Sequence, residues 1–363
     1  MARKGENIYK RKDGRWEGRY RIGFDETGKS KYRSVYAHSY QEIKEKLSKL
    51  KADAIKFISS GRVTVKALFD EWLSAVRLKV KQSTYANYLM KVKKHLLPMF
   101  GGLLYEKLTA KSVHEFIDKK LKNGLSAKYV SDIITVFKSM TKYISRIYGY
   151  HNPLENVILP KSEKKETVLL SHAEQEILSY TVQRRQDSTG IAVLLSYYTG
   201  LRIGEVCGLR WSDINFEKNS LTVSRTVQRI TQKNGNHATH LLIGTPKSRT
   251  SVRTIPLPKF LMNILSKHKT KADAYILSQT ASPVEPRTLQ YRFKSLLKRA
   301  NLPSVKFHAL RHMFASNCIR LGFDVKTLSE ILGHSAVETT LNRYVHASIE
   351  QKIACMNLLR PVA

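Results

Sequence analysis

Four short stretches in the second half of the chain place basic, histidine and tyrosine side chains where they could act on a phosphate. In the first stretch, a Thr-Gly break separates two predicted helices and puts Arg202 in the first turn of the second helix. The N-terminus of a helix favours anions, so an arginine there is well placed to bind a phosphate. Further on, His308 and Arg311 stand three residues apart on one helical face and could converge on the same ligand. The other two stretches contribute a lysine at a predicted turn between strands, a histidine and a tyrosine: Lys247, His334 and Tyr344.

Taken singly, each of these residues has an ordinary structural interpretation. A lone arginine on a helix usually pairs with a surface carboxylate, and a tyrosine at helical spacing usually packs in or beside a core. His308 and His312 could form a metal pair, but the zinc-protease pattern has glutamate after the first histidine and this chain has Ala309. We therefore expect no metal site and no cofactor.

Taken in order, the four stretches resemble the catalytic signature of the tyrosine recombinases, the family of phage and conjugative-transposon integrases. That family orders its active-site residues as Arg, Lys, His-x-x-Arg, His or Trp, and Tyr. This chain offers the same types in the same order: Arg202, Lys247, His308, Arg311, His334 and Tyr344. The flanks match as well, with Thr-Gly-Leu before the first arginine and Leu-Gly before the last histidine. The resemblance covers nearly the whole chain.

The resemblance implies a site-specific recombinase that integrates and excises a mobile element, a prophage or a conjugative transposon, without metal or ATP. Tyr344 would attack the phosphorus, form a 3′-phosphotyrosyl bond and release a 5′-hydroxyl. His308 would accept the tyrosine proton, and Lys247 would protonate the leaving oxygen. The negative charge of the transition state would be held by three donors: Arg202, Arg311 and His334. Glu205, the acid nearest to the first arginine, is expected to orient the arginines.

Residues 1–60 are predicted to form a small three-stranded β-sheet closed by a helix. Turn signals at Asp13-Gly14 and at residues 25–28 flank a strand in which aromatic residues alternate with arginines. Period two places the two kinds on opposite faces, which would leave a basic face for DNA; a solvated sheet face is the alternative. The resemblance implies an arm-type DNA-binding domain. The candidate DNA contacts are Arg15, Arg19, Arg21, Lys31 and Arg33.

The rest of the chain is predicted to be mainly helical, so the fold class is multidomain and mainly α. Residues 63–150 carry four apolar stripes at helical spacing and would be the helical core-binding domain of the family. Residues 151–169 hold two prolines and a charged run and are predicted to be a linker. Residues 170–363 are predicted to form the catalytic domain, mixed but mainly α, with a small β-sheet and a C-terminal tail. That sheet is expected near residues 220–256, with a longer hairpin inserted between Val227 and Thr245.

The charge of the chain favours a polyanionic partner. It holds 63 lysines and arginines against 29 acidic residues, a formal net charge of +34. Basic residues occur in every segment, which favours a long nucleic-acid contact over a membrane patch. No apolar stretch approaches the roughly 20 residues that span a bilayer, and the three cysteines lack zinc-ligand spacing. We expect a cytoplasmic, nucleoid-associated protein of a bacterial host cell.

The resemblance also implies the partners of the chain. These are double-stranded DNA attachment sites, three further copies in a homotetramer on DNA and, as accessory factors, a host DNA-bending protein and an excisionase. The apolar residues of the tail at 349–359 would pack on their own domain or on a neighbouring copy. Two other functions would use the same features: a DNA-binding regulator with an idle tyrosine site, and a type IB topoisomerase. The complete set of catalytic residue types favours an enzyme, and the separate N-terminal domain favours an integrase.

Overall fold

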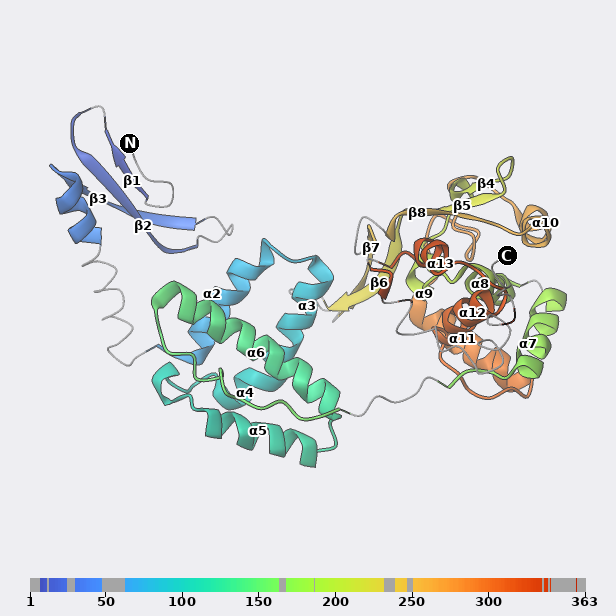
Figure 1. The fold of residues 1–363 in the computed structure, drawn as a ribbon, viewed down its shortest axis with the longest axis horizontal. Helices are drawn as coiled ribbons and strands as arrows, with labels where there is room; N and C mark the ends of the chain where they lie inside the picture. Colours follow the sequence, from blue (N-terminus) through green and yellow to red (C-terminus); the bar gives the residue numbers. More distant parts are fainter. Residues whose placement is uncertain are drawn as a thin grey trace, which may run out of the picture. The chain divides into compact units, whose positions relative to one another are not determined.

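The computed structural model describes residues 7–11, 13–24, 30–47, 63–162, 168–185, 187–231, 239–246, 251–334, 336–338, 340 and 357, without the side chains of 20–24, 30–33 and 231. These residues are mainly helical with three small sheets (Figure 1), which confirms the predicted fold class. They form two compact units, and the division between them falls at Lys164–Lys165.

The N-terminal sheet is antiparallel and has the order β1 (Ile8–Lys10), β2 (Trp16–Phe24), β3 (Ser30–Ala37). The helix at residues 40–47 covers one face of it, and its Ile43 and Leu47 are buried. A β-carbon on Gly18, within β2, would lie 2.6 Å from Leu47 and 2.9 Å from Ile43. The glycine therefore allows the helix to pack directly on the strand. The predicted sheet and its covering helix are confirmed.

Short helices make up the next part of the first unit. They are α2 (Val65–Arg77), α3 (Gln82–Lys91), the π turn η1 (Val92–Leu96), α4 (Leu97–Phe100), the 3-10 turn η2 (Tyr105–Lys107), α5 (Ala110–Lys122) and α6 (Ala127–Tyr148). The side chains of Thr64, Thr109 and Ser126 each accept a backbone N–H three residues further on, so they cap α2, α5 and α6. The four predicted helices are present.

The second predicted helix contains a π turn that the sequence did not indicate. We expected the helix to stop near Pro98 and Gly101-Gly102, and the helical path ends at Phe100, directly before Gly101. The N–H of Leu97 bonds to Val92 O, five residues back, and Pro98 follows in the first turn of α4. A proline in a first turn lacks an N–H that would have no helical partner in any case, so it does not break the path.

The helical core extends into the segment that was predicted to be a linker. Leu154 and Val157 are buried in the same cluster as Phe69, Phe100 and Phe137. Lys138 Nζ donates to Val157 O at 2.7 Å, and Ser131 Oγ donates to Pro160 O at 3.1 Å. Residues 154–160 therefore pack on the helical core and accept hydrogen bonds from α6.

The second unit carries the stretches that could do chemistry. Its helices are α7 (His172–Arg185), α8 (Ser188–Thr199), α9 (Ile203–Cys207), the 3-10 turn η3 (Trp211–Asp213), α10 (Lys259–His268), α11 (Pro286–Arg299), α12 (Ala309–Arg320) and α13 (Val325–Leu332). Its strands are β4 (Ile214–Asn215), β5 (Ser220–Val223), β6 (Thr226–Thr231), β7 (Thr239–Gly244) and β8 (Arg253–Pro256). The order β4-β5-β8 makes one antiparallel sheet, while β6 and β7 form the predicted inserted hairpin.

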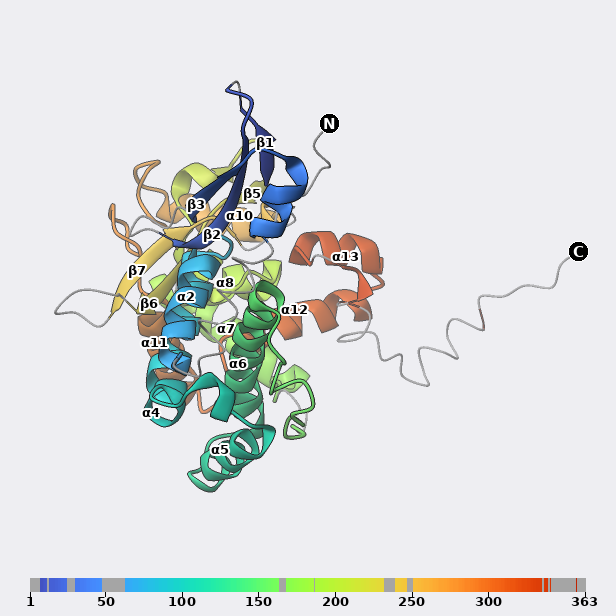
Figure 2. The ribbon, with the colours of Figure 1, turned by 90° about the vertical axis from the view of Figure 1, so that its left-hand side faces the viewer.

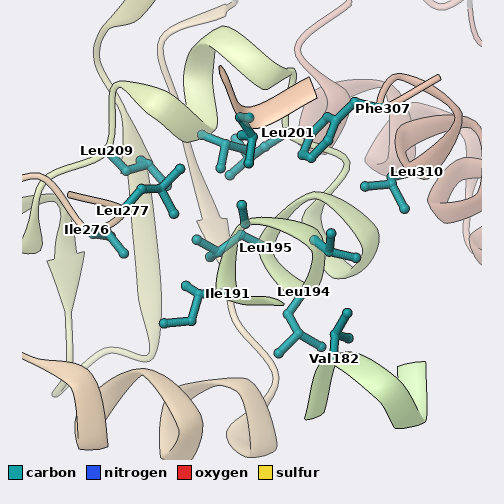
Figure 3. Packing of buried hydrophobic residues seen from close by; sticks show 14 of the residues in the cluster. Val182, Ile191, Leu194, Leu195, Leu201, Leu209, Ile276, Leu277, Phe307 and Leu310 are labelled. Carbon is teal, nitrogen blue, oxygen red and sulfur yellow. The ribbon is translucent and has the colours of Figure 1, made fainter. Parts of the chain in front are cut away.

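Helix α8 is the centre of this unit. Its residues Ile191 to Leu195 are buried, and Figure 3 shows Ile191, Leu194 and Leu195 among side chains that come from the surrounding segments. Helices α12 and α13 lie side by side (Figures 1 and 2) and share a small core made by Phe314, Leu328 and Leu332. This packing brings the C-terminal ends of α8 and α13 close to the start of α12.

Candidate active site

Arg202 follows a tight turn at the end of α8. Gly200 has φ 68°, in the left-handed region, and a β-carbon there would lie 2.6 Å from Phe314 and 2.7 Å from Leu332. Glycine therefore satisfies both the turn and the close approach of α12 and α13. Arg202 is the residue that precedes α9, not a residue of its first turn as predicted. The helix begins one residue later because Arg202 is still extended, with ψ 149°.

Glu205 joins two arginines in the interior. Its carboxylate accepts from Arg202 N–H and Nη1, both at 2.9 Å, and from Arg253 Nη1 and Nη2 at 3.3 and 3.1 Å. The Glu205 side chain is 3% exposed, whereas that of Arg202 is 37% exposed. Burial on its own raises the pKa of Glu205, but the charge and hydrogen bonds of Arg253 and then Arg202 outweigh it and hold this pKa below its ordinary value. Glu205 therefore orients Arg202, as the sequence predicted, and also Arg253.

Arg311 connects three segments and is 1% exposed. It lies in the first turn of α12, donates from Nη1 to Gly200 O and from Nη2 to Leu332 O, both at 2.7 Å, and reaches His334 Nε2 at 2.8 Å. A guanidinium can only donate, so His334 Nε2 accepts in this contact. The other ring nitrogen, Nδ1, lies 2.8 Å from Thr340 Oγ1, and in this tautomer it is the donor. Arg311 and His334 thus meet at the end of α13.

His308 stands directly before α12 and has helical backbone angles, so it lies one helical turn from Arg311. Its ring makes an edge contact with the ring of His312, with centroids 4.9 Å apart. In the described part of the chain, no group of three or more His, Cys, Asp or Glu side chains could hold a metal ion.

Two of the six predicted catalytic residues lie outside the described residues. Lys247 falls between β7, which ends at Gly244, and β8, which begins at Arg253. Tyr344 comes after α13, and so does the predicted tail. Of the other four, the structure brings Arg311 and His334 into direct contact. Arg311 also donates to the carbonyl of Gly200, which is two residues before Arg202 in the chain.

Arg253 is a residue of this site that the sequence analysis missed. Its side chain is 6% exposed, and its guanidinium bonds Glu205 on one side and Ile331 O of α13, at 2.5 Å, on the other. A signal was available in the pattern. Arg253 alternates with Ile255 in a predicted strand, so period two puts both on one face, and a charge on the buried face of a strand needs a partner.

The predicted DNA contacts of the N-terminal sheet are paired within the sheet where they are described. Arg15 contacts Asp13 at 2.8 Å and lies over the ring of Tyr36, with 5.7 Å to its centroid. Arg19 contacts the buried Glu17 at 2.7 Å. The side chains of Arg21, Lys31 and Arg33 lie outside the described residues. Tyr36 of β3, which is 43% exposed, lies on this face beside Arg15, so the face is not purely basic.

Comparison with known proteins places these features in a family. Residues 163–351 match the model of the phage integrase family, and residues 64–121 match that of a phage integrase N-terminal SAM-like domain. A tyrosine recombinase XerC-like protein from Caldanaerobacter subterraneus is 28% identical over 93% of this chain and 94% of its own length. The ICEBs1 integrase of Bacillus subtilis is 25% identical over 94% of this chain and 95% of its own.

The fold agrees with this assignment. The Tn1549 transposon integrase in complex with a circular intermediate DNA superposes with a TM-score of 0.66 at 24% identity, over 82% of this chain and 99% of that one. No helix in the described residues is long and apolar enough to cross a membrane. Since the match to the family model alone spans more than half of the 363 residues, the chain belongs to the phage integrase family, the tyrosine recombinases, enzymes that cleave and rejoin DNA.

Proposed function

We propose that this chain recognises attachment sites in double-stranded DNA and recombines them to integrate and excise a mobile element. Its relatives support this reading, because an integrase of an integrative element and a transposon integrase match it over most of its length. The observation that carries the proposal is the buried contact of Arg311 with the ends of α8 and α13. It joins the turn before Arg202, the start of α12 and the end of α13, which are the segments that carry Arg202, His308 and His334.

In the proposed reaction, the oxygen of Tyr344 attacks the phosphorus, and the bond between phosphorus and the 5′-oxygen breaks. The tyrosine proton goes to His308, and Lys247 gives a proton to the leaving 5′-oxygen, so charge and atoms balance. The bond energy stays in the 3′-phosphotyrosine, and the reverse attack by a 5′-hydroxyl rejoins a strand without ATP.

The charge that develops on the non-bridging oxygens is held by Arg202 and Arg311. Both are oriented before DNA arrives, Arg202 by Glu205 and Arg311 by two backbone carbonyls, so little reorganisation is needed during the reaction. His334 is the third donor that we propose, and its ring would first have to leave the contact in which Nε2 accepts from Arg311.

The stoichiometry of the reaction supports a homotetramer on DNA. Exchange between two duplexes breaks four strands, and each chain supplies one nucleophilic tyrosine. Residues 1–60 would bind arm-type sites, residues 63–160 the core site and residues 170–363 the scissile phosphate, with 161–169 as the linker, because residues 154–160 pack on α6. A host DNA-bending protein and an excisionase are the accessory partners that we propose, in the cytoplasm of a bacterial host.

A covalent-trapping assay tests the proposal. The full chain is incubated in EDTA with a nicked suicide duplex that carries the attachment site, and the products are resolved under denaturing conditions. We expect a protein–DNA adduct that is absent with Tyr344→Phe. Tight, site-specific binding without an adduct would instead indicate a regulator, and relaxation of plasmids that lack the site would indicate a topoisomerase.

A further inference from the structure

We infer that Arg253 is a positioning residue for DNA cleavage, which keeps the charge of Arg202 available to the phosphate and fixes the end of α13. The inference rests on the proposed function of the site. It concerns a residue outside the six of the signature, and its support comes from the contacts of the Arg253 guanidinium.

All three guanidinium nitrogens of Arg253 have partners in the interior. Nε donates to Ile331 O at 2.5 Å, Nη1 donates to Ser251 O at 3.1 Å and to Glu205 at 3.3 Å, and Nη2 donates to Glu205 at 3.1 Å. The side chain starts from the first residue of β8, and the 6% exposure of the side chain keeps water away from these bonds. A lysine could not reproduce this fork, because one ammonium cannot span a carboxylate and a distant carbonyl.

The contact with Ile331 completes the C-terminus of α13. The last four carbonyls of a helix have no partner within it. Here the N–H groups of Gly333 and His334 serve Ser329 O and Glu330 O. The other two are served by arginines, Ile331 O by Arg253 and Leu332 O by Arg311. Two cations also suit the negative end of a helix dipole. His334 follows directly, so Arg253 and Arg311 together set where its ring lies.

The contact between Arg253 and Glu205 determines how much of the positive charge of Arg202 is available to a phosphate. The carboxylate accepts two of its four bonds from Arg253 and two from Arg202, and Arg253 is the larger cause that lowers its pKa. With Arg253 present, the charges of Arg253 and Glu205 cancel each other. The positive charge of Arg202 is then left for a phosphate. Without Arg253, the single negative charge of Glu205 would be balanced by Arg202 alone. Arg202 would then be drawn toward the carboxylate and would stabilise an anionic transition state less.

The test compares two suicide duplexes, one with the natural scissile phosphate and one with a methylphosphonate, in which a methyl group replaces a charged oxygen. Single-turnover adduct formation is measured for the wild-type chain, Arg253→Met, Arg253→Lys and the double variant Arg253→Met/Glu205→Gln. Each protein is compared with itself on the two duplexes, so a lower folded fraction cancels. Arg225→Met removes a half-buried ion pair of this unit, with Asp213 at 2.6 Å, and is the control.

On the natural phosphate we expect Arg253→Met to react roughly 10²-fold more slowly than wild type, the lower end of the loss for one transition-state donor. Arg253→Lys keeps the charge beside Glu205 but loses the fork to Ile331 O, so its defect should be smaller than that of Arg253→Met. On the methylphosphonate the defect should shrink markedly, because there is less charge to stabilise. The double variant should react faster than Arg253→Met, because Glu205 no longer neutralises Arg202. Arg225→Met should show equal ratios on both duplexes.

Equal defects of Arg253→Met on both duplexes, or a double variant slower than the single one, would overturn the inference. They would leave the proposed function intact, since the wild-type chain would still form its adduct. A wild-type chain that binds both duplexes and forms no adduct would remove the proposed function and the inference with it.

Discussion

Arg311 is the residue on which the geometry of the site depends most. Its two carbonyl ligands belong to different segments, and each is 2.7 Å from a different terminal nitrogen. We expect Arg311→Lys to lose adduct formation as fully as Arg311→Met, because an ammonium lacks the fork that spans both. Each buried carbonyl left unpaired costs about 1–3 kcal/mol, so both variants should also unfold at lower urea concentration.

The matched control for Arg311 is Arg320→Lys, at the exposed end of the same helix. Covalent trapping and urea unfolding should both be unchanged in that variant. Wild-type cleavage by Arg311→Lys would show that charge at this position suffices and that the fork is not needed.

Glu205 gives the site a predictable response to acid. Its pKa in the folded chain lies below the ordinary 4.5, so its ion pairs stabilise the fold fully above about pH 4.5 and lose that contribution as pH falls through the lower folded pKa. Removing one partner of a buried pair costs about 3–5 kcal/mol. We therefore expect Glu205→Gln to be less stable than wild type by a constant amount from pH 7 to 5, and the difference to shrink below that. Urea unfolding at a series of pH values measures it, and a difference that grows with acid would contradict the assignment.

For single residues of the site, the sequence predicted the residue types and their order but not all of their contacts. Glu205 was identified because it is the acidic residue nearest to Arg202 in the sequence, which is a local feature. Arg253 was missed because its partners, Glu205 and Ile331, are 48 and 78 residues away in the chain. The period-two pattern could indicate that Arg253 lies on the buried face of its strand. It could not indicate which distant residues Arg253 would contact, because those pairs depend on tertiary packing.

Among the elements, the turn after α8 is the one that positions the site. Gly200 has φ 68° and meets Phe314 and Leu332, whereas Gly322 has φ 82° with nothing within 4 Å. A left-handed alanine costs about 1–2 kcal/mol wherever it stands. We expect Gly322→Ala to show only that loss of stability and to keep its cleavage rate. Gly200→Ala should lose clearly more stability and should cleave slowly, because the clash displaces α12 and α13 from Arg202. Unfolding and single-turnover cleavage of the two variants measure the difference, and equal losses would mean that the close approach is unimportant.

Element prediction succeeded where caps and apolar spacing agree, and it missed a change of helical winding and the packing of residues beyond α6. Thr64 and Ser126 were predicted as the starts of α2 and α6, because a cap acts on the backbone only three residues away. The π turn at Val92–Leu96 was not predicted, because no residue type in that stretch signals it. For the same reason, Leu154 and Val157 looked like linker residues although they fill the helical core.

For the whole molecule, charge and domain order suggest how binding is divided along the chain. Residues 1–60 hold sixteen lysines and arginines and eight acids, about a quarter of the net charge of +34. Some of this charge is used within the sheet, where Arg15 and Arg19 contact Asp13 and Glu17. The larger surplus belongs to the segments that would hold the crossover site.

Removal of residues 1–60 should therefore separate two kinds of binding. We expect the shortened chain to lose arm-site binding and to keep cleavage of the crossover duplex. For an arm-site fragment, the plot of log affinity against log salt changes by about 0.9 for each phosphate contact, so the full chain should be steeper than Arg15→Gln/Arg19→Gln. Filter binding at several salt concentrations measures the slopes, and the suicide duplex measures cleavage. If the shortened chain is folded by circular dichroism yet no longer cleaves, the N-terminal sheet also serves the crossover site. An unchanged slope in the double variant would remove Arg15 and Arg19 as phosphate contacts.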